Sequence, residues 1–278
     1  MANTNGSRAD INTAKQKQAT DTAEDIRPFV APSRKVGLDA PLRWLKLGWR
    51  DFRRIPQLSF GYGLVLTAIS VLIISIAWSA HSLVLAIALI GGFFFVGPAI
   101  AIGLYSMSRQ LENGITPVLM RCLREGRKNF GNEMILAFIF LIIFLIWARA
   151  ASMVHIFLPS FGATTPADLI KFLSIGSTIG AVFAALVFCI GAFSIPMMMD
   201  RNVDAITAVI SSVNAVLHNK TTMLLWGLMV VTGIVVGILA GFIGLAVTLP
   251  VIGHATWHAY REVIDADAWE RSPGIKTD

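Results

Sequence analysis

Charged residues are scarce in this sequence: Asp, Glu, Lys and Arg make up 14% of the 278 residues, whereas hydrophobic residues make up 55%. A soluble globular domain usually carries about 25% charged residues. No charged residue occurs between Arg54 and Arg109, and apolar runs longer than about 18 residues are typical of helices that cross a bilayer. The composition excludes an ordinary soluble domain and predicts an all-α, polytopic membrane protein.

Cysteine and histidine are also scarce. Cys122 and Cys189 show no spacing typical of a disulfide framework or a metal site, so we expect both to be small apolar residues. Of the five histidines, only His254 and His258 lie four residues apart, which places two imidazoles on one helix face. We expect this pair to hydrogen-bond across helices or to lie at the headgroup level, without a cofactor. The alternative is a haem or metal ion at His254 and His258.

Motifs typical of enzymes are missing. The sequence has no glycine-rich phosphate loop, nucleophile elbow or catalytic triad order. The centres of the apolar runs also lack the carboxylates that proton-coupled transporters usually carry. We therefore predict a protein that is not an enzyme, and we assign no catalytic residue.

The apolar runs predict six membrane spans, because about 20 helical residues cross the hydrocarbon core. A five-span chain, in which Pro250 starts an external segment, is the alternative. The six spans are 58–78, 82–107, 134–156, 169–199, 222–240 and 242–261.

These spans pair into three hairpins, each preceded by a predicted cytoplasmic amphipathic helix, which together indicate a weak threefold repeat. The amphipathic helices begin near Asp39, Thr116 and Asp204. The predicted organisation is a disordered cytoplasmic tail and linker (1–38), a six-span transmembrane domain (39–262) and a second cytoplasmic tail (263–278).

Basic residues set the predicted orientation. All Lys and Arg residues except Arg149 and Lys171 fall on one side of the predicted spans. This asymmetry predicts a multi-pass protein of the bacterial cytoplasmic (inner) membrane with both termini in the cytoplasm. The net charge of +6 therefore indicates a membrane surface and not nucleic acid. We expect Arg149, inside a span, to snorkel to the far headgroups or to pack against a polar neighbour, with a functional charge as the alternative.

The predicted helix at 39–55 is basic and amphipathic. Its apolar positions recur at helical spacing, and Trp44 and Trp49 suit the headgroup level of a bilayer. We expect this helix to bind anionic lipid headgroups. A docking surface for a partner protein is the alternative.

A proline motif recurs at the inner ends of the spans. Pro98 is followed by Tyr105 and Arg109, and an aromatic residue and an arginine follow Pro250 at the same two spacings; residues 196–201 hold a shorter version. We expect Asp200 and Arg201 to form an ion pair at a helix end or to bond the facing loop. The predicted ligand- or partner-binding residues are Tyr105, Arg109, Arg149, Asp200, Arg201, His254, Trp257, His258 and Arg261.

Several short motifs carry a family resemblance; they lie at 41–45, 48–51, 62–63, 97–109, 196–201 and 253–261. Over about residues 27–264 the chain resembles an uncharacterised prokaryotic family of predicted integral membrane proteins with a domain of unknown function. Some members are labelled cytochrome c oxidase subunit. A haem–copper catalytic subunit would need at least six histidine ligands, so five histidines permit only an accessory or assembly role.

We therefore expect a partner-binding accessory or assembly factor, with a respiratory complex as the candidate partner. The partner would be a membrane protein in the same lipid bilayer. A transporter or channel for a small or lipid-like solute is the alternative, because proline-broken spans and internal repeats are typical of transporters.

Overall fold

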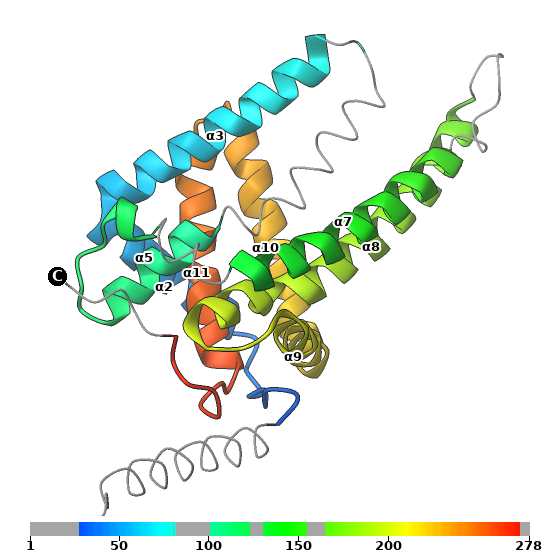
Figure 1. Ribbon diagram of the computed structural model, residues 1–278. Helices are drawn as coiled ribbons and strands as arrows, with labels where there is room; N and C mark the ends of the chain where they lie inside the picture. The colour runs from blue at the N-terminus through cyan, green and yellow to red at the C-terminus, as the bar shows by residue number, and fades with distance from the viewer. Residues whose placement is uncertain (1–27, 80, 82–100, 123–129, 155–164, 273–278) are drawn as a thin grey trace, which may run out of the picture.

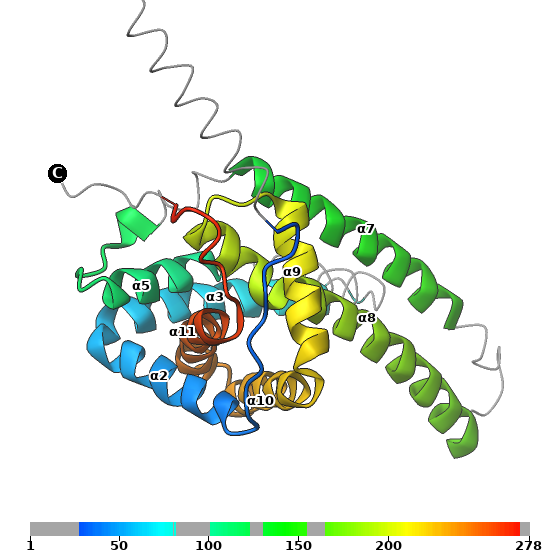
Figure 2. The ribbon, with the colours of Figure 1, turned by 90° about the horizontal axis from the view of Figure 1, so that it is seen from below.

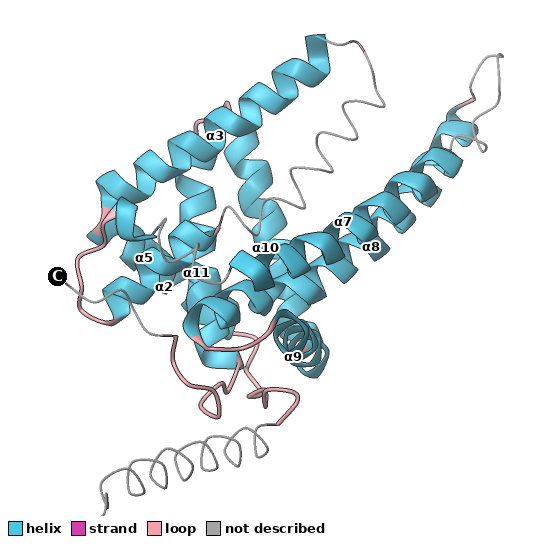
Figure 3. Ribbon diagram, in the orientation of Figure 1, coloured by secondary structure: helices cyan, strands magenta, loops and turns pink. Residues whose placement is uncertain are grey.

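A computed structural model describes residues 28–79, 81, 101–122, 130–154 and 165–272. The regular elements in this part of the chain are helices (Figure 3), which confirms the predicted all-α class. These helices are α2 (Ala40–Arg54), α3 (Pro56–Ser79), α5 (Ile102–Glu112), α7 (Phe130–Val154), α8 (Pro166–Asp200), α9 (Ala205–His218), α10 (Lys220–Leu239) and α11 (Leu245–Val263).

Four of these helices, α3, α7, α8 and α10, are long and apolar enough to cross a membrane. They correspond to the first, third, fourth and fifth predicted spans. The sixth predicted span is helical as α11, which follows a turn at Gly241 and Phe242 where both residues have positive φ. The second predicted span and the amphipathic helix expected after Thr116 lie largely outside the described residues. The threefold repeat therefore stays a prediction.

Helix α11 is the centre of one half of the molecule. It packs against α2, α3, α5, α8 and α10, and Figure 2 shows it nearly end-on among its neighbours. Two glycines permit the close approach. A Cβ atom on Gly48 of α2 would lie 2.5 Å from the carbonyl oxygen of Val251, and one on Gly63 of α3 would overlap the carbonyl oxygen of Ala246. Small residues at such contacts let helix backbones touch directly.

The other half is the hairpin of α7 and α8, which extends away from α2, α5 and α11 (Figure 1). Thr165 and Asp168 form a capping box at the start of α8. Helix α8 has 35 residues, whereas about 20 are enough to cross the hydrocarbon core. Helix α8 is therefore longer than a span requires, and its C-terminal end meets the C-terminal ends of α5 and α11. We call the region where the C-terminal ends of α5, α8 and α11 meet the base of the molecule.

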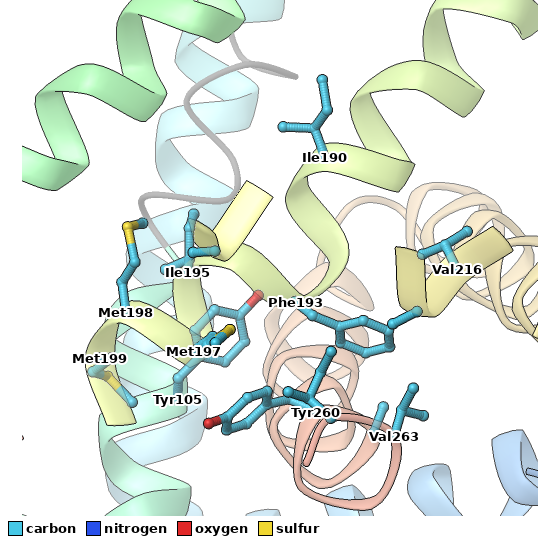
Figure 4. Packing of buried hydrophobic residues seen from close by; sticks show 14 of the residues in the cluster. Tyr105, Ile190, Phe193, Ile195, Met197, Met198, Met199, Val216, Tyr260 and Val263 are labelled. Carbon is cyan, nitrogen blue, oxygen red and sulfur yellow. The ribbon is translucent and has the colours of Figure 1, made fainter. Parts of the chain in front are cut away.

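An apolar cluster fills the base. Figure 4 shows its members converging from α5, α8 and α11, among them Tyr105, Met197 and Tyr260, which are all buried. Helix α9 covers α8, and Asp204 caps α9 as predicted, because its carboxylate accepts hydrogen bonds from the backbone N–H groups of Ile206 and Thr207 at 2.9 and 3.0 Å.

The segments expected to be a linker and a tail also pack on the base. Residues 28–38 and 264–272 contribute the buried side chains of Ala31 and Trp269. Isolated β-bridges join Ser33 to Ile264 and Arg201 to Arg271. Backbone and side-chain hydrogen bonds both hold these segments: Arg34 N donates to the carbonyl of Val263, and Val36 N donates to Asn219 Oδ1.

Helix α2 has the predicted bounds but a different environment. Its apolar face packs on α11 and α10, so Trp44 is fully buried and stacks edge-on against Trp226 with ring centroids 5.6 Å apart. The prediction that Trp44 lies at the headgroup level is therefore wrong, because protein and not lipid covers this face. Trp49 remains 45% exposed.

Candidate functional site

The predicted binding residues gather at the base, with one exception. Helix α5 supplies Tyr105 and Arg109, the end of α8 supplies Asp200 and Arg201, and α11 supplies the others. Arg149 lies exposed on α7, and among the described residues it makes no ion pair. The polar side chains form two clusters, centred on Asp200 and on Asp51.

The Asp200 cluster joins the ends of three helices. Tyr260 Oη donates to Asp200 Oδ2 at 2.9 Å, Arg201 Nε at 3.2 Å and Arg261 Nη1 at 3.3 Å. Arg109 Nε lies 3.9 Å from Asp200 Oδ1. The predicted ion pair of Asp200 and Arg201 is therefore present, and the arginines of all three proline motifs meet at this one carboxylate, which is 3% exposed.

The C-terminal segment closes the Asp200 cluster. The Arg109 guanidinium donates to the backbone carbonyls of Met199 at 2.9 Å and Ser272 at 2.6 Å. The Arg201 guanidinium donates to the carbonyl of Trp269 at 2.8 Å and to Asp267 Oδ1 at 2.9 Å. Burial alone would lower the pKa of Arg201, but the nearby Asp200 carboxylate raises it above its ordinary value. Hydrogen bonds to the C-terminal segment thus hold both guanidinium groups in place.

The Asp51 cluster joins α2, α3, α5 and α11 through a chain of five side chains. Ser59 Oγ lies 3.0 Å from His254 Nε2, and His254 Nδ1 lies 2.8 Å from Ser108 Oγ. Ser108 Oγ donates to Asp51 Oδ2 at 3.0 Å, and His258 Nε2 lies 2.7 Å from the same oxygen.

The hydrogen positions in this chain follow from Asp51, because an ionised carboxylate only accepts. The hydroxyl of Ser108 has a single proton, which it donates to Asp51. Ser108 Oγ therefore accepts a hydrogen bond from His254 Nδ1–H. Ser59 then donates to His254 Nε2, and His258 donates its Nε2–H to Asp51. Both ring nitrogens of His254 are engaged, so ligation of a metal ion or haem by His254 would break one of these bonds.

Asp51 is held as an anion. Burial raises its pKa, but the hydrogen bond and charge of His258, with smaller contributions from His254 and Ser108, outweigh this effect and leave the pKa below its usual value. In the described part of the chain, no group of three or more His, Cys, Asp and Glu side chains is arranged to hold a metal ion.

Glu112 at the end of α5 connects α5 to α11. Trp257 Nε1 donates to Glu112 Oε2 at 2.9 Å, and Arg261 Nε donates to Glu112 Oε1 at 3.2 Å. Arg261 therefore contacts two carboxylates, those of Glu112 and Asp200.

The sequence analysis missed six members of these clusters: Asp51, Ser59, Ser108, Glu112, Tyr260 and Asp267. Asp51 and Ser108 lie inside motifs that carried the family resemblance, at 48–51 and 97–109, so a signal for them existed. Ser59 and Glu112 lie outside every motif, and only the packing of α3 and α5 on α11 places them in the clusters.

A family model supports the membrane assignment. Residues 85–200 match the model described as a predicted integral membrane protein (DUF2189). No curated protein and no solved structure matches the chain significantly. The matched stretch includes Tyr105, Arg109 and Asp200 and ends before His254. Together with the four helices that are apolar enough to cross a membrane, this match indicates an integral membrane protein. Over residues 85–200, less than half of its length, the chain is similar to DUF2189, an uncharacterised family of the kind that its motifs resemble.

Proposed function

We propose that this protein is a non-enzymatic accessory or assembly factor that binds another membrane protein. A respiratory complex is the first partner to test, because the family resemblance includes members labelled as oxidase subunits. We place the protein in the bacterial cytoplasmic membrane with both termini inside, in keeping with its basic residues.

One observation carries this proposal: a face of α8 that is exposed and made of small side chains. We call it the small-residue face; its members are Ser174, Ser177, Thr178, Ala181, Ala184 and Ala185. They recur at helical spacing over the apolar part of a candidate span. Small residues on a transmembrane helix favour association, because they let a second helix approach closely enough for packing and weak hydrogen bonds.

Helix α7 provides the contrast within the same hairpin. Its exposed side chains are large, including Phe138 at 62%, Leu141 at 47% and Leu145 at 57% exposure. Lipid tails cover such side chains well. Helix α8 also exposes large side chains, such as Leu173 at 53% and Val182 at 63%. These lie beside the small-residue face, and that face is the surface suited to another helix.

The two polar clusters fit a supporting role. Asp51 is 2% and Asp200 is 3% exposed, and each carboxylate is fully engaged with partners from other helices. Such clusters fix the base of the molecule, from which the α7–α8 hairpin extends into the membrane.

The test is recovery of partners by the tagged full-length protein from membranes in mild detergent, quantified by mass spectrometry. Ala181→Phe and Ala185→Phe together should lower the recovery of a specific membrane partner about tenfold, since overpacking a helix contact costs about 1–3 kcal/mol. The control is Leu145→Phe on α7, which also adds an aromatic ring to an exposed membrane face. Equal recovery with both variants, or no partner above the background of an untagged strain, would contradict the proposal.

A further inference from the structure

The outer face of α2 carries four exposed cationic side chains. We call it the basic face; its members are Lys46, Arg50, Arg53 and Arg54, and all four are exposed. Among the described residues none of them makes an ion pair or a side-chain hydrogen bond. Arg43 on the same helix differs, because it pairs with Asp39 and lies 2.5 Å from Glu262 Oε1.

Tertiary packing fixes the direction of this face. The opposite side of α2 presses Gly48 against the backbone of α11 at Val251 and Ala255. Trp44 Nε1 donates to Glu262 Oε2 at 2.9 Å. These contacts leave α2 little freedom to rotate, so its cations point permanently away from the protein.

The position of α2 along the chain sets the depth of the basic face. Helix α2 ends at Arg54, and α3, a candidate membrane span, begins at Pro56. Arg53 and Arg54 therefore lie at the start of a span, where Lys and Arg extend their aliphatic stems along apolar surface and place their charges among headgroups.

Two apolar side chains flank these cations. Leu42 is 51% and Trp49 is 45% exposed, and Trp49 stacks on Phe52 with ring centroids 5.5 Å apart. Tryptophan is enriched at the membrane–water interface because its ring is amphipathic. A face with cations at its centre and an exposed tryptophan beside them matches a lipid surface that carries phosphate groups.

We propose that the basic face of α2 binds the phosphate headgroups of anionic phospholipids in the leaflet where α3 enters the membrane. Charge complementarity and continuity with α3 carry the assignment. The occupant is lipid of the same bilayer, and the site does not depend on the partner proposed for α8.

The test measures lipid preference in reconstituted bilayers. The full-length protein is placed in phosphatidylcholine membranes, and its association with spin-labelled phosphatidylglycerol is compared with that of spin-labelled phosphatidylcholine. The test variant is Lys46→Gln, Arg50→Gln, Arg53→Gln and Arg54→Gln combined, since glutamine keeps the helix propensity. The matched control removes four other exposed charges through Lys35→Gln, Lys171→Gln, Lys220→Gln and Arg271→Gln.

We expect the preference for the anionic lipid to fall at least fivefold in the test variant, because one basic residue near an anionic surface contributes about that factor. High salt should suppress the preference of the unmodified protein, and the control should keep most of it. An unchanged preference in the test variant overturns the proposal. The basic face would then be suited to an acidic protein and not to lipid. An equal loss in both variants also overturns it, since net charge alone would then explain the effect. If the fourfold variant does not fold, Lys46→Gln with Arg50→Gln provides the same comparison.

Discussion

The base and the α7–α8 hairpin are stabilised by different interactions. At the base, charged and polar side chains from α2, α3, α5, α8 and α11 are buried and paired with one another. Along the hairpin, α7 buries only 17% of its candidate span inside the protein. Lipid is as apolar as leucine, so packing there gains little from the hydrophobic effect, whereas an unpaired charge at the base would be costly.

This difference indicates where a substitution should affect stability most. A substitution at the base disturbs several helices at once, because each carboxylate bonds to more than one of them. A substitution on the exposed face of α7 exchanges one lipid contact for another. Four predictions test this difference, from the largest effect to the smallest.

Loss of the central carboxylate should have the largest effect. Asp200→Ala leaves Arg109 and Arg201 buried beside Arg261 without their shared anion. Removing one partner of a buried ion pair costs about 3–5 kcal/mol. We expect a large drop in the thermal unfolding midpoint in detergent, measured by intrinsic fluorescence. A midpoint equal to that of the unmodified protein would show that the Asp200 cluster does not hold the base together.

Close packing of α3 on α11 should be the next most sensitive feature. Gly63→Ala adds a Cβ that overlaps the carbonyl oxygen of Ala246, and overpacking typically costs about 1–3 kcal/mol. Gly61 lies two residues earlier on α3, and a Cβ there would meet no atom within 4 Å. Gly61→Ala is therefore the matched control and should be neutral or slightly stabilising. Equal unfolding midpoints for the two variants would contradict this account of the contact.

Asp51 should give a smaller effect that depends on pH. Asp51→Asn should lower stability at pH 7 by about 1.5 kcal/mol, the usual contribution of hydrogen bonds to a charged group. The folded pKa of Asp51 lies below its usual value, so folded protein binds this proton less readily than unfolded protein. Its stabilisation is present above the unfolded value of about 3.9 and is lost as the pH falls through the lower folded value.

The measurement is the difference in unfolding midpoint between the unmodified protein and Asp51→Asn from pH 7 down to pH 3. This difference should be constant at the higher pH values and shrink below about pH 4. A difference that grows on acidification would mean that Asp51 is not an anion in the folded state.

Arg149 should give the smallest effect. Its side chain is exposed on α7, so Arg149→Gln should change stability by less than about 0.5 kcal/mol, as is usual for surface positions. The measurement is the same thermal scan, with Asp200→Ala as the reference for a large change. A loss comparable to that of Asp200→Ala would assign Arg149 a buried partner and remove the contrast between hairpin and base.

The sequence predicted the helices better than it predicted their contacts. Long apolar runs identified α3, α7, α8 and α10, and Asp204 marked the start of α9. The proline motifs identified the base, since Arg109, Asp200 and Arg261 belong to them and lie together. Trp44 was misplaced, because amphipathic spacing shows which face of α2 is apolar but not whether lipid or protein covers it.

By itself, the sequence determined that this protein lives in a membrane and which helix ends carry charge. Both follow from local composition, since a span needs only length and the absence of charge. Only the tertiary structure decided that Asp51 and Ser108 join His254 and His258, that residues 264–272 close the Asp200 cluster, and that the cations of α2 face outward. Those features depend on how helices distant in sequence approach one another at Gly48 and Gly63, which no local pattern records.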